Sequence, residues 1–180
     1  MLGDSLSAEY GLPRGSGGVA LLEQRLAQQQ IKAKVINASI SGDTSSGGRS
    51  RLPVLLKLHA PSHVLIELGG NDALRGLPLA MTRDNLRAML RAAKDSGAKL
   101  MVVGMQLPPN YGARYGQDFA ALFADTARSE GAALVPFLLA GVADAANAEQ
   151  LFQRDRIHPT AAAQPQLLAN VWPVLKPWLR

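Results

Sequence analysis

The stretch HVLIELG at residues 63–69 decides the fold class of this chain. Its central residues are aliphatic with no alternation of apolar and polar side chains, which is typical of a strand covered on both faces of a parallel sheet. The stretch KLMVVGM at residues 99–105 has the same character. Two further strand candidates are AKVINAS at 33–39 and ALVPFL at 133–138. Together they predict an α/β chain with a parallel central sheet.

Amphipathic segments alternate with these runs and predict helices over 19–30, 82–96, 117–130 and 160–179, the last interrupted by Pro165, Pro173 and Pro177. Thr82 is placed to cap the start of the 82–96 helix. Gly97 and Gly131 stand where C-terminal glycines are expected. The alternation of strands and helices continues along the chain, with no repeat or linker.

The composition indicates one globular domain spanning residues 1–180. The chain has 180 residues, of which 47% are hydrophobic and 18% charged. The net charge of +5 is scattered, and its densest cluster is only GGRSR at 47–51, so we expect no nucleic-acid partner. There are no cysteines, which excludes disulfides, thiolate nucleophiles and sulfur-ligated metals. No apolar run approaches the length of a membrane span, so we expect no stable membrane insertion.

The loops that follow the strands concentrate glycine and polar residues. They read SISGDTSSGG at 39–48, GGNDALRG at 69–76 and QLPPNYGARYG at 106–116. In open parallel sheets ligands bind at the carboxyl ends of the strands. We therefore expect the functional site in these loops.

A candidate serine nucleophile lies in LGDSLSAEY at 2–10, and a candidate base in RDRIHPT at 154–160. Acyl transfer by serine needs a base, an orienting carboxylate and donors for the oxyanion. The chain has only three histidines; His59 and His63 precede a strand and so lie at the opposite edge of the sheet. His158 has Asp155 three residues before it, a spacing that can bring carboxylate and imidazole together.

Each of these signals is weak by itself. Aspartate and serine are common turn formers, an Asp/His pair also occurs as a surface ion pair, and Gly42 and Asn71 fit ordinary glycine-rich turns. GSGGVA at 15–20 matches a dinucleotide fingerprint but follows no strand, and SGDTSSGG lacks the lysine of a P-loop. No histidine pair has metal-ligand spacing. We therefore expect neither a cofactor nor a metal.

Taken in order, five stretches resemble the SGNH (GDSL-type) hydrolases, specifically the bacterial multifunctional thioesterase/lysophospholipase/arylesterase subgroup. They are LGDSLSA, VINASISGDTS, LIELGGNDALRG, LPPNYG and DRIHP. The resemblance implies a flavodoxin-like three-layer α/β/α sandwich. It also implies a triad of Ser5 as nucleophile, His158 as general base and Asp155 as its orienter. The oxyanion hole would be the backbone N–H groups of Ser5 and Gly42 and the side-chain amide of Asn71.

The implied substrates are acyl or aryl esters, acyl thioesters or lysophospholipids. The segment after Asn71 matches a loop that closes over the acyl chain in this subgroup. Candidate substrate-binding residues are Asp72, Leu74, Leu77, Leu107, Pro108 and Tyr111. Two alternatives stay open: a carbohydrate acetylesterase on the same scaffold, and a non-catalytic binding protein that kept the fold. We expect a monomer that is periplasmic or secreted, with a cytoplasmic location as the alternative.

Three departures from the subgroup carry expectations of their own. Glycine is usual where Glu9 stands, so a carboxylate could lie near the site entrance and disfavour anionic substrates. Glycine is also usual where Arg156 stands, and Arg156 could compete with His158 for Asp155. The hydrophobic strand expected before Ser5 is reduced to Met1 and Leu2, which suggests a truncated first strand with sequence missing upstream.

Overall fold

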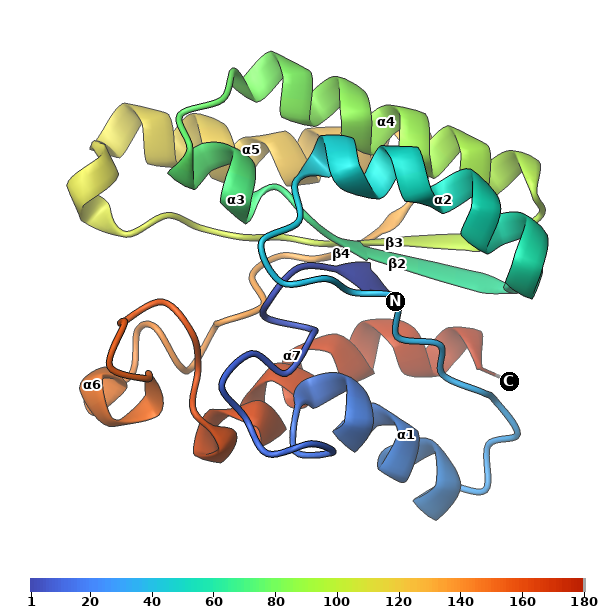
Figure 1. Cartoon of the computed structure of the whole chain (residues 1–180), viewed down its shortest axis with the longest axis horizontal. Helices are drawn as coiled ribbons and strands as arrows, with labels where there is room; N and C mark the ends of the chain where they lie inside the picture. Colours follow the sequence, from blue (N-terminus) through green and yellow to red (C-terminus); the bar gives the residue numbers. More distant parts are fainter. Residues whose placement is uncertain (180) are drawn as a thin grey trace.

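The protein, described here over residues 1–179 by a computed structural model, is built around a parallel sheet with strand order β1-β2-β3-β4 (Figure 1). The strands are β1 (Leu2–Gly3), β2 (His63–Glu67), β3 (Lys99–Val103) and β4 (Ala133–Val135). In the ladder Leu2 lies opposite Ile66, and Val102 lies opposite both Ile66 and Leu134. The predictions for 63–69, 99–105 and 133–138 are confirmed as strands, each ending earlier than expected.

The prediction of a fourth strand at 33–39 is wrong, because no regular strand forms there. The segment is extended and lies beside β1, where Ala38 N donates to Met1 O (2.9 Å) and Ile40 N to Gly3 O (3.0 Å). The carbonyl of Ala38 accepts from Arg51 Nη1 (2.8 Å) instead of a backbone N–H, which interrupts the ladder. β1 is nevertheless flanked on both sides, as the first strand of a flavodoxin-like order should be.

Helices cover both faces of the sheet. In Figure 1 α1 (Gly18–Gln28) and α7 (Gln164–Leu175) lie below it, and α2 (Ser45–His59), α4 (Leu79–Asp95) and α5 (Ala113–Glu130) lie above it. Two short helices, α3 (Gly70–Leu74) and α6 (Ala148–Leu151), belong to loops at the carboxyl ends of the strands. No helix within residues 1–179 is long and apolar enough to cross a membrane.

The sheet is buried on both faces, as its aliphatic runs predict. Val64, Ile66 and Val102 pack into a core with α2, α4 and α5. Leu65 and Met101 point the other way, into a second core with α1 and α7. Two cores on one sheet make the three layers of an α/β/α sandwich.

The helix predictions differ from the structure at two places. Helix α4 begins at Leu79 after Pro78, not at Thr82, whose buried hydroxyl donates instead to Asp72 Oδ1 (3.3 Å). Helix α2 has no counterpart among the sequence predictions. It contains Pro53 and, in its first turn, Gly47 and Gly48, all residues of low helix propensity, and it depends on packing against α4 and the sheet.

Candidate active site

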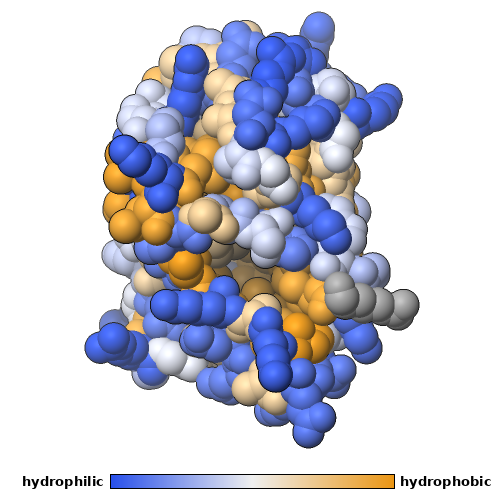
Figure 2. All heavy atoms as spheres, turned by 90° about the vertical axis from the view of Figure 1, so that its right-hand side faces the viewer, coloured by the Kyte–Doolittle hydropathy of each residue, from blue (hydrophilic) through white to orange (hydrophobic). Residues whose placement is uncertain are grey.

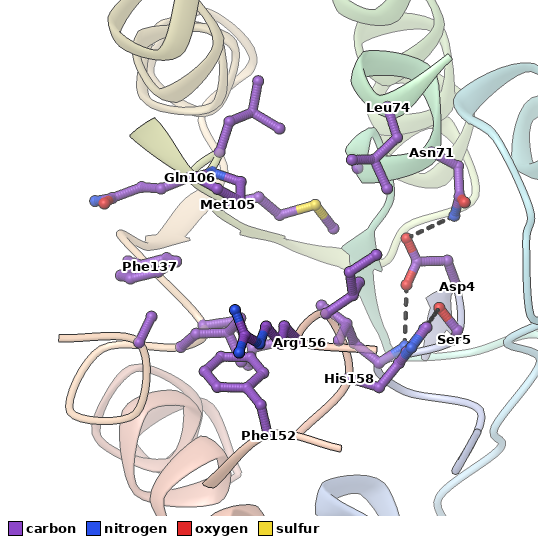
Figure 3. A pocket seen from close by; sticks show the side chains of 18 of the residues that line it. Asp4, Ser5, Asn71, Leu74, Met105, Gln106, Phe137, Phe152, Arg156 and His158 are labelled. Carbon is purple, nitrogen blue, oxygen red and sulfur yellow. Dashed lines mark hydrogen bonds between the residues drawn. The ribbon is translucent and has the colours of Figure 1, made fainter. Parts of the chain in front are cut away.

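Ser5, His158 and Asp155 form a continuous hydrogen-bonded chain at the carboxyl edge of the sheet. Ser5 lies in the turn that follows β1, and the other two lie in the loop between α6 and α7. His158 Nε2 is 2.8 Å from Ser5 Oγ (Figure 3), and His158 Nδ1 is 2.7 Å from Asp155 Oδ2. The fold thus joins groups separated by about 150 residues in a geometry suited to proton transfer from the hydroxyl.

The backbone of the histidine loop holds the Asp155 carboxylate in its charged form. Burial alone would raise the pKa of Asp155, but Asp155 Oδ1 accepts from the N–H groups of His158 (3.0 Å) and Ile157 (2.9 Å). Together with the imidazole, these donors lower the pKa to about 2. An ionised carboxylate on Nδ1 favours the tautomer in which Nε2 accepts the hydroxyl proton.

Arg156 does not compete for this carboxylate. Within residues 1–179 Arg156 forms no ion pair with Asp155, and its side chain lines the cavity in front of Ser5 (Figure 3). Its backbone has φ +58°, and Glu9 has φ +59°. This left-handed region favours glycine, which explains why glycine suits both positions.

The carboxylate of Glu9 does not lie at the entrance of the site, contrary to expectation. Glu9 turns away from the cavity, and its side chain accepts hydrogen bonds from Gly15 N (3.0 Å) and Gly17 N (2.7 Å). The bonds fix the loop that leads into α1. Glu9 therefore stabilises a loop and does not line the cavity within the described residues.

Gly42 and Asn71, the two donors expected beside Ser5, line the same cavity as Ser5. Gly42 has φ +78° in the loop after 33–39, a conformation that glycine adopts without a steric penalty. Its carbonyl accepts from Arg75 Nη2 (2.9 Å), which fixes the peptide from the far side. Asn71, in the first turn of α3, donates an amide N–H to Asp4 Oδ2 (3.1 Å; Figure 3).

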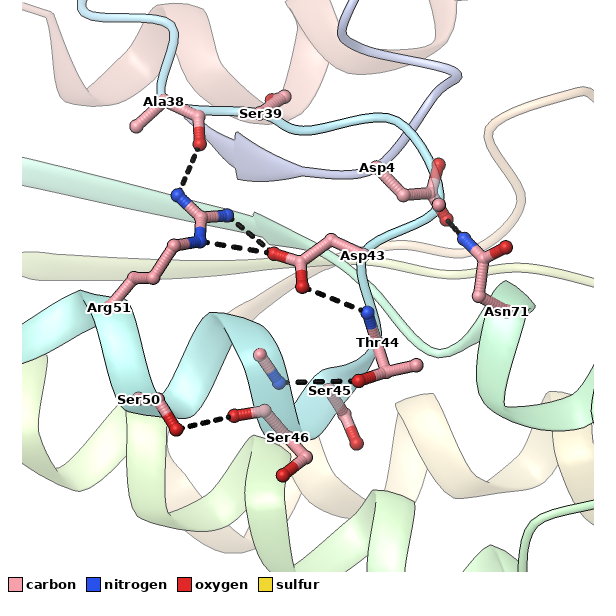
Figure 4. Close-up of polar contacts among 12 residues, drawn as sticks. Asp4, Ala38, Ser39, Asp43, Thr44, Ser45, Ser46, Ser50, Arg51 and Asn71 are labelled. Atoms are coloured by element: carbon pink, nitrogen blue, oxygen red, sulfur yellow. Dashed lines mark hydrogen bonds and ion pairs between the residues drawn. The ribbon is translucent and has the colours of Figure 1, made fainter.

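The loop that carries Gly42 is braced by polar contacts at its other end (Figure 4). Arg51 on α2 forms an ion pair with Asp43 and also reaches the carbonyl of Ala38. Thr44 caps α2 by accepting from Gly47 N (3.2 Å). The position of Gly42 is therefore set by α2, an element that the sequence did not reveal.

Beneath Ser5 lies a pair of buried carboxyl groups, Asp4 and Glu67. Burial raises the pKa of Asp4 to about 6, although the N–H of Leu6 and the amide of Asn71 favour its charged form. Burial, followed by the charge of Asp4, raises the pKa of Glu67 well above its usual range. Neither residue was a candidate from the sequence.

A cavity of about 680 Å³ opens in front of Ser5 and His158. Three of the predicted substrate-binding residues line it, namely Leu74, Leu107 and Pro108. Most of the other lining side chains are hydrophobic and were not predicted; they include Tyr10, Met105, Phe119, Phe137, Leu138, Leu139 and Phe152. The Tyr10 ring lies 4.4 Å from the His158 ring, centroid to centroid, and so limits how the imidazole can move.

The other predicted substrate-binding residues, Asp72, Leu77 and Tyr111, do not line the cavity. Asp72 is fully buried and accepts from Ser45 N (2.8 Å), the Ser45 hydroxyl and Thr82 Oγ1. It therefore joins the starts of α2, α3 and α4. The Asp72 prediction is corrected by this burial, because no substrate atom can reach its carboxylate.

His59, the last residue of α2, and His63, the first residue of β2, lie near the amino end of β2, and neither lines the cavity. Figure 2 views the molecule from the right-hand side of Figure 1 and shows hydrophilic side chains interspersed with exposed hydrophobic ones. His63 is held by Ser62 Oγ (2.9 Å) and the carbonyl of Trp178 (3.2 Å). Among residues 1–179 no three His, Asp or Glu side chains are grouped closely enough to hold a metal ion.

Comparison with known proteins shows the family. The model of the GDSL-like lipase/acylhydrolase family matches residues 1–164. The chain is 51% identical to the esterase TesA of Pseudomonas aeruginosa, over 99% of this chain and 88% of that protein. It is 44% identical to the thioesterase 1/protease 1/lysophospholipase L1 of Escherichia coli, over 92% of this chain and 76% of that protein.

Solved structures agree with these sequence matches. A crystal structure of TesA superposes with a TM-score of 0.94 over 99% of this chain and 97% of that chain. The esterase EstA from Pseudoalteromonas sp., solved with monoethylphosphonate as inhibitor, is 39% identical and superposes with a TM-score of 0.92, over 99% of this chain and 96% of that one. The chain therefore belongs to the GDSL-like lipase/acylhydrolase family.

Proposed function

We propose that this protein hydrolyses carboxylic esters and thioesters through Ser5, with acyl or aryl esters, acyl thioesters and lysophospholipids as its substrate range. The observation that carries the proposal is the Ser5–His158–Asp155 chain facing a largely hydrophobic cavity. The names of relatives at 42–51% identity, which include esterase, thioesterase, lysophospholipase and arylesterase, support the same range.

In the proposed reaction His158 Nε2 takes the hydroxyl proton while Ser5 Oγ attacks the acyl carbon. The oxyanion that forms is held by the N–H groups of Ser5 and Gly42 and by the second amide N–H of Asn71. His158 then gives its proton to the leaving alcohol or thiol, and the acyl group stays on Ser5. Water attacks this acyl-enzyme by the reverse proton path and releases the acid.

The acyl chain would occupy the cavity that Leu74, Leu107 and Phe137 help to line. Burying a methylene there contributes about 0.8 kcal/mol, so longer acyl chains should bind more tightly until the cavity is full. A carbohydrate acetylesterase would prefer acetyl and gain nothing from added methylenes. On the resemblance to the subgroup we also propose a monomer that acts in the periplasm or outside the cell.

Hydrolysis of p-nitrophenyl esters with two to ten acyl carbons tests this proposal. We expect kcat/KM to rise with chain length and then level off, and Ser5→Ala to reduce it to background. Ser50→Ala, at an exposed serine on α2, is the matched control and should be as active as wild type. Full activity of Ser5→Ala would refute the proposed nucleophile, and a strict acetyl preference would favour the acetylesterase.

A further inference from the structure

Glu67 is the only fully buried glutamate among residues 1–179, and it lies directly beneath the turn that carries Ser5. Glu67 Oε2 accepts hydrogen bonds from the N–H of Asp4 (3.2 Å) and the hydroxyl of Ser7 (2.8 Å). These two donors lie on either side of Ser5 in the chain. A single carboxyl group at the end of β2 therefore fixes the backbone of the nucleophile turn.

The turn is packed tightly against this carboxyl group. A Cβ atom at Gly3 would come 2.6 Å from Glu67 Oε2, closer than real contacts allow. Gly3 is therefore required because a side chain would not fit there. Backbone conformation is not the reason, since the φ of Gly3 is not positive. The sequence GDS and the buried Glu67 form one packed unit.

The second oxygen of Glu67 indicates which protonation state this unit has. Glu67 Oε1 is buried, and no donor within residues 1–179 reaches it. An ionised carboxylate would leave that buried oxygen without a hydrogen-bond partner, which is unfavourable for a charged group. A neutral carboxylic acid instead has a hydroxyl to donate, and the neighbouring carboxyl group is that of Asp4, whose own N–H already donates to Glu67 Oε2.

Asp4 connects this proton to the oxyanion donors. Its Oδ2 accepts from the Asn71 amide (3.1 Å), and its Oδ1 accepts from Leu6 N (3.0 Å). The other titratable group that acts on Asp4 is His158, and no lysine or arginine within residues 1–179 is paired with either carboxyl. A proton on Glu67 would therefore leave Asp4 as the single negative charge that orients Asn71.

We propose that Glu67 is a positioning residue of this active site: as a neutral acid it holds the Ser5 turn and donates to Asp4, which orients the Asn71 amide toward the oxyanion. The inference rests on the proposed function, since it assigns Glu67 a role in a reaction at Ser5. It predicts that the enzyme tolerates a side chain at position 67 that cannot ionise but keeps its hydrogen-bonding atoms. It also predicts that the enzyme does not tolerate the loss of those atoms.

Two substitutions test the proposal. Glu67→Gln keeps a hydrogen-bond acceptor and a donor but cannot ionise. We therefore expect kcat within about threefold of wild type at pH 7. Glu67→Leu removes both, so we expect kcat to fall at least tenfold with KM changed less than twofold. Glu130→Gln, at a buried glutamate paired with Arg91 on the far side of α5, is the control and should leave kcat unchanged.

The pH dependence of stability gives a readout that does not depend on catalysis. A carboxyl group whose pKa is raised by folding loses stabilising protons as pH rises, so the wild type should lose Tm relative to Glu67→Gln between pH 4 and pH 8. Equal losses of kcat in Glu67→Gln and Glu67→Leu would overturn the proposal, because they would show that the charge is needed. So would a Glu67→Leu variant with normal kcat and only a lower Tm. A wild type without esterase activity would refute the proposed function, while the Tm comparison would still test the proton on Glu67.

Discussion

The side-chain amide of Asn71 has two hydrogens, for which we propose different roles. One is donated to Asp4, and in the proposed reaction the other is donated to the oxyanion beside Ser5. A donor to the developing oxyanion contributes roughly 3–4 kcal/mol in the transition state. Asn71→Ala should therefore lower kcat by on the order of a hundredfold or more, with KM little changed.

Steady-state kinetics on p-nitrophenyl butyrate check this prediction. Asn147→Ala is a suitable control, because Asn147 is exposed and makes no side-chain cap to α6. If Asn71→Ala retained wild-type kcat, the amide would have only its structural bond to Asp4.

Asp155 should remain ionised throughout the pH range of an assay. Its pKa of about 2 lies below the unfolded value, so its contribution to stability is present above about pH 4 and is lost as pH falls toward 2. Asp155→Asn removes the charge that orients His158 and should lower kcat/KM by about two to four orders of magnitude. The two values of kcat/KM are compared on the alkaline plateau of each pH profile, so that protonation of the imidazole does not enter the ratio. An Asp155→Asn variant with wild-type kcat/KM on that plateau would contradict this role of Asp155.

At the residue scale the sequence revealed the groups that stand in distinctive motifs. Ser5, Asn71 and His158 were candidates because the stretches that contain them occur together in the order of one family, although the motifs of Ser5 and His158 are weak by themselves. Glu67, Tyr10 and Arg75 were not, because each acts on a residue that only the fold brings near. Asp72 stands next to Asn71 in sequence, yet on the short helix α3 its side chain turns into the core.

Helices α2 and α5 each contain a glycine whose surroundings predict opposite effects of added volume. A Cβ on Gly48 of α2 would come 2.2 Å from Leu68 Cδ1 in the core, whereas nothing lies within 4 Å of a Cβ on Gly116 of α5. Gly48→Ala should therefore destabilise the protein by about 1–3 kcal/mol through overpacking. Gly116→Ala should stabilise it by about 0.5–1 kcal/mol through helix propensity.

Urea unfolding of the two variants gives this comparison directly. The m-values should match that of wild type, so that the shift in midpoint reports stability. A stabilising Gly48→Ala would contradict the packing of α2 against Leu68.

Asp72 joins three helices through its buried hydrogen bonds. Removing its carboxylate in Asp72→Ala leaves Ser45 N and two hydroxyls without their acceptor, and each unsatisfied group costs about 1–3 kcal/mol. We expect a loss of at least about 2 kcal/mol in the free energy of unfolding. Asp84→Ala, at an exposed aspartate on α4, should change it by less than about 0.5 kcal/mol. Equal stability of the two variants in urea would contradict this role.

Helices and strands were predicted correctly from the sequence where the hydrophobic pattern matches the burial of the element in the structure. The runs at 63–69 and 99–105 are aliphatic because both faces of β2 and β3 are covered. Prediction failed at α2, where glycines and Pro53 mask a helix that tertiary packing stabilises. It also failed at 33–39, because Arg51 takes the carbonyl that a regular ladder would use.

For the whole molecule, the parallel sheet explains why distant residues meet at one edge. The turn after β1, the loop before α2 and helix α3 after β2 all lie at the carboxyl ends of the strands, and the loop before α7 brings His158 to them (Figure 1). The strand order and the loop compositions predicted this convergence. The shape of the cavity was not predictable, because side chains such as Phe137 and Phe152 come from segments without any motif.

Covalent labelling with a fluorophosphonate, followed by peptide mass spectrometry, tests most directly whether Ser5 is the nucleophile. We expect a single adduct per chain, on the peptide that contains Ser5. Labelling should be absent in Ser5→Ala and strongly slowed in His158→Ala, because the base that takes the hydroxyl proton is lost. No adduct on the wild type, or an adduct that persists in Ser5→Ala, would show that Ser5 is not the nucleophile.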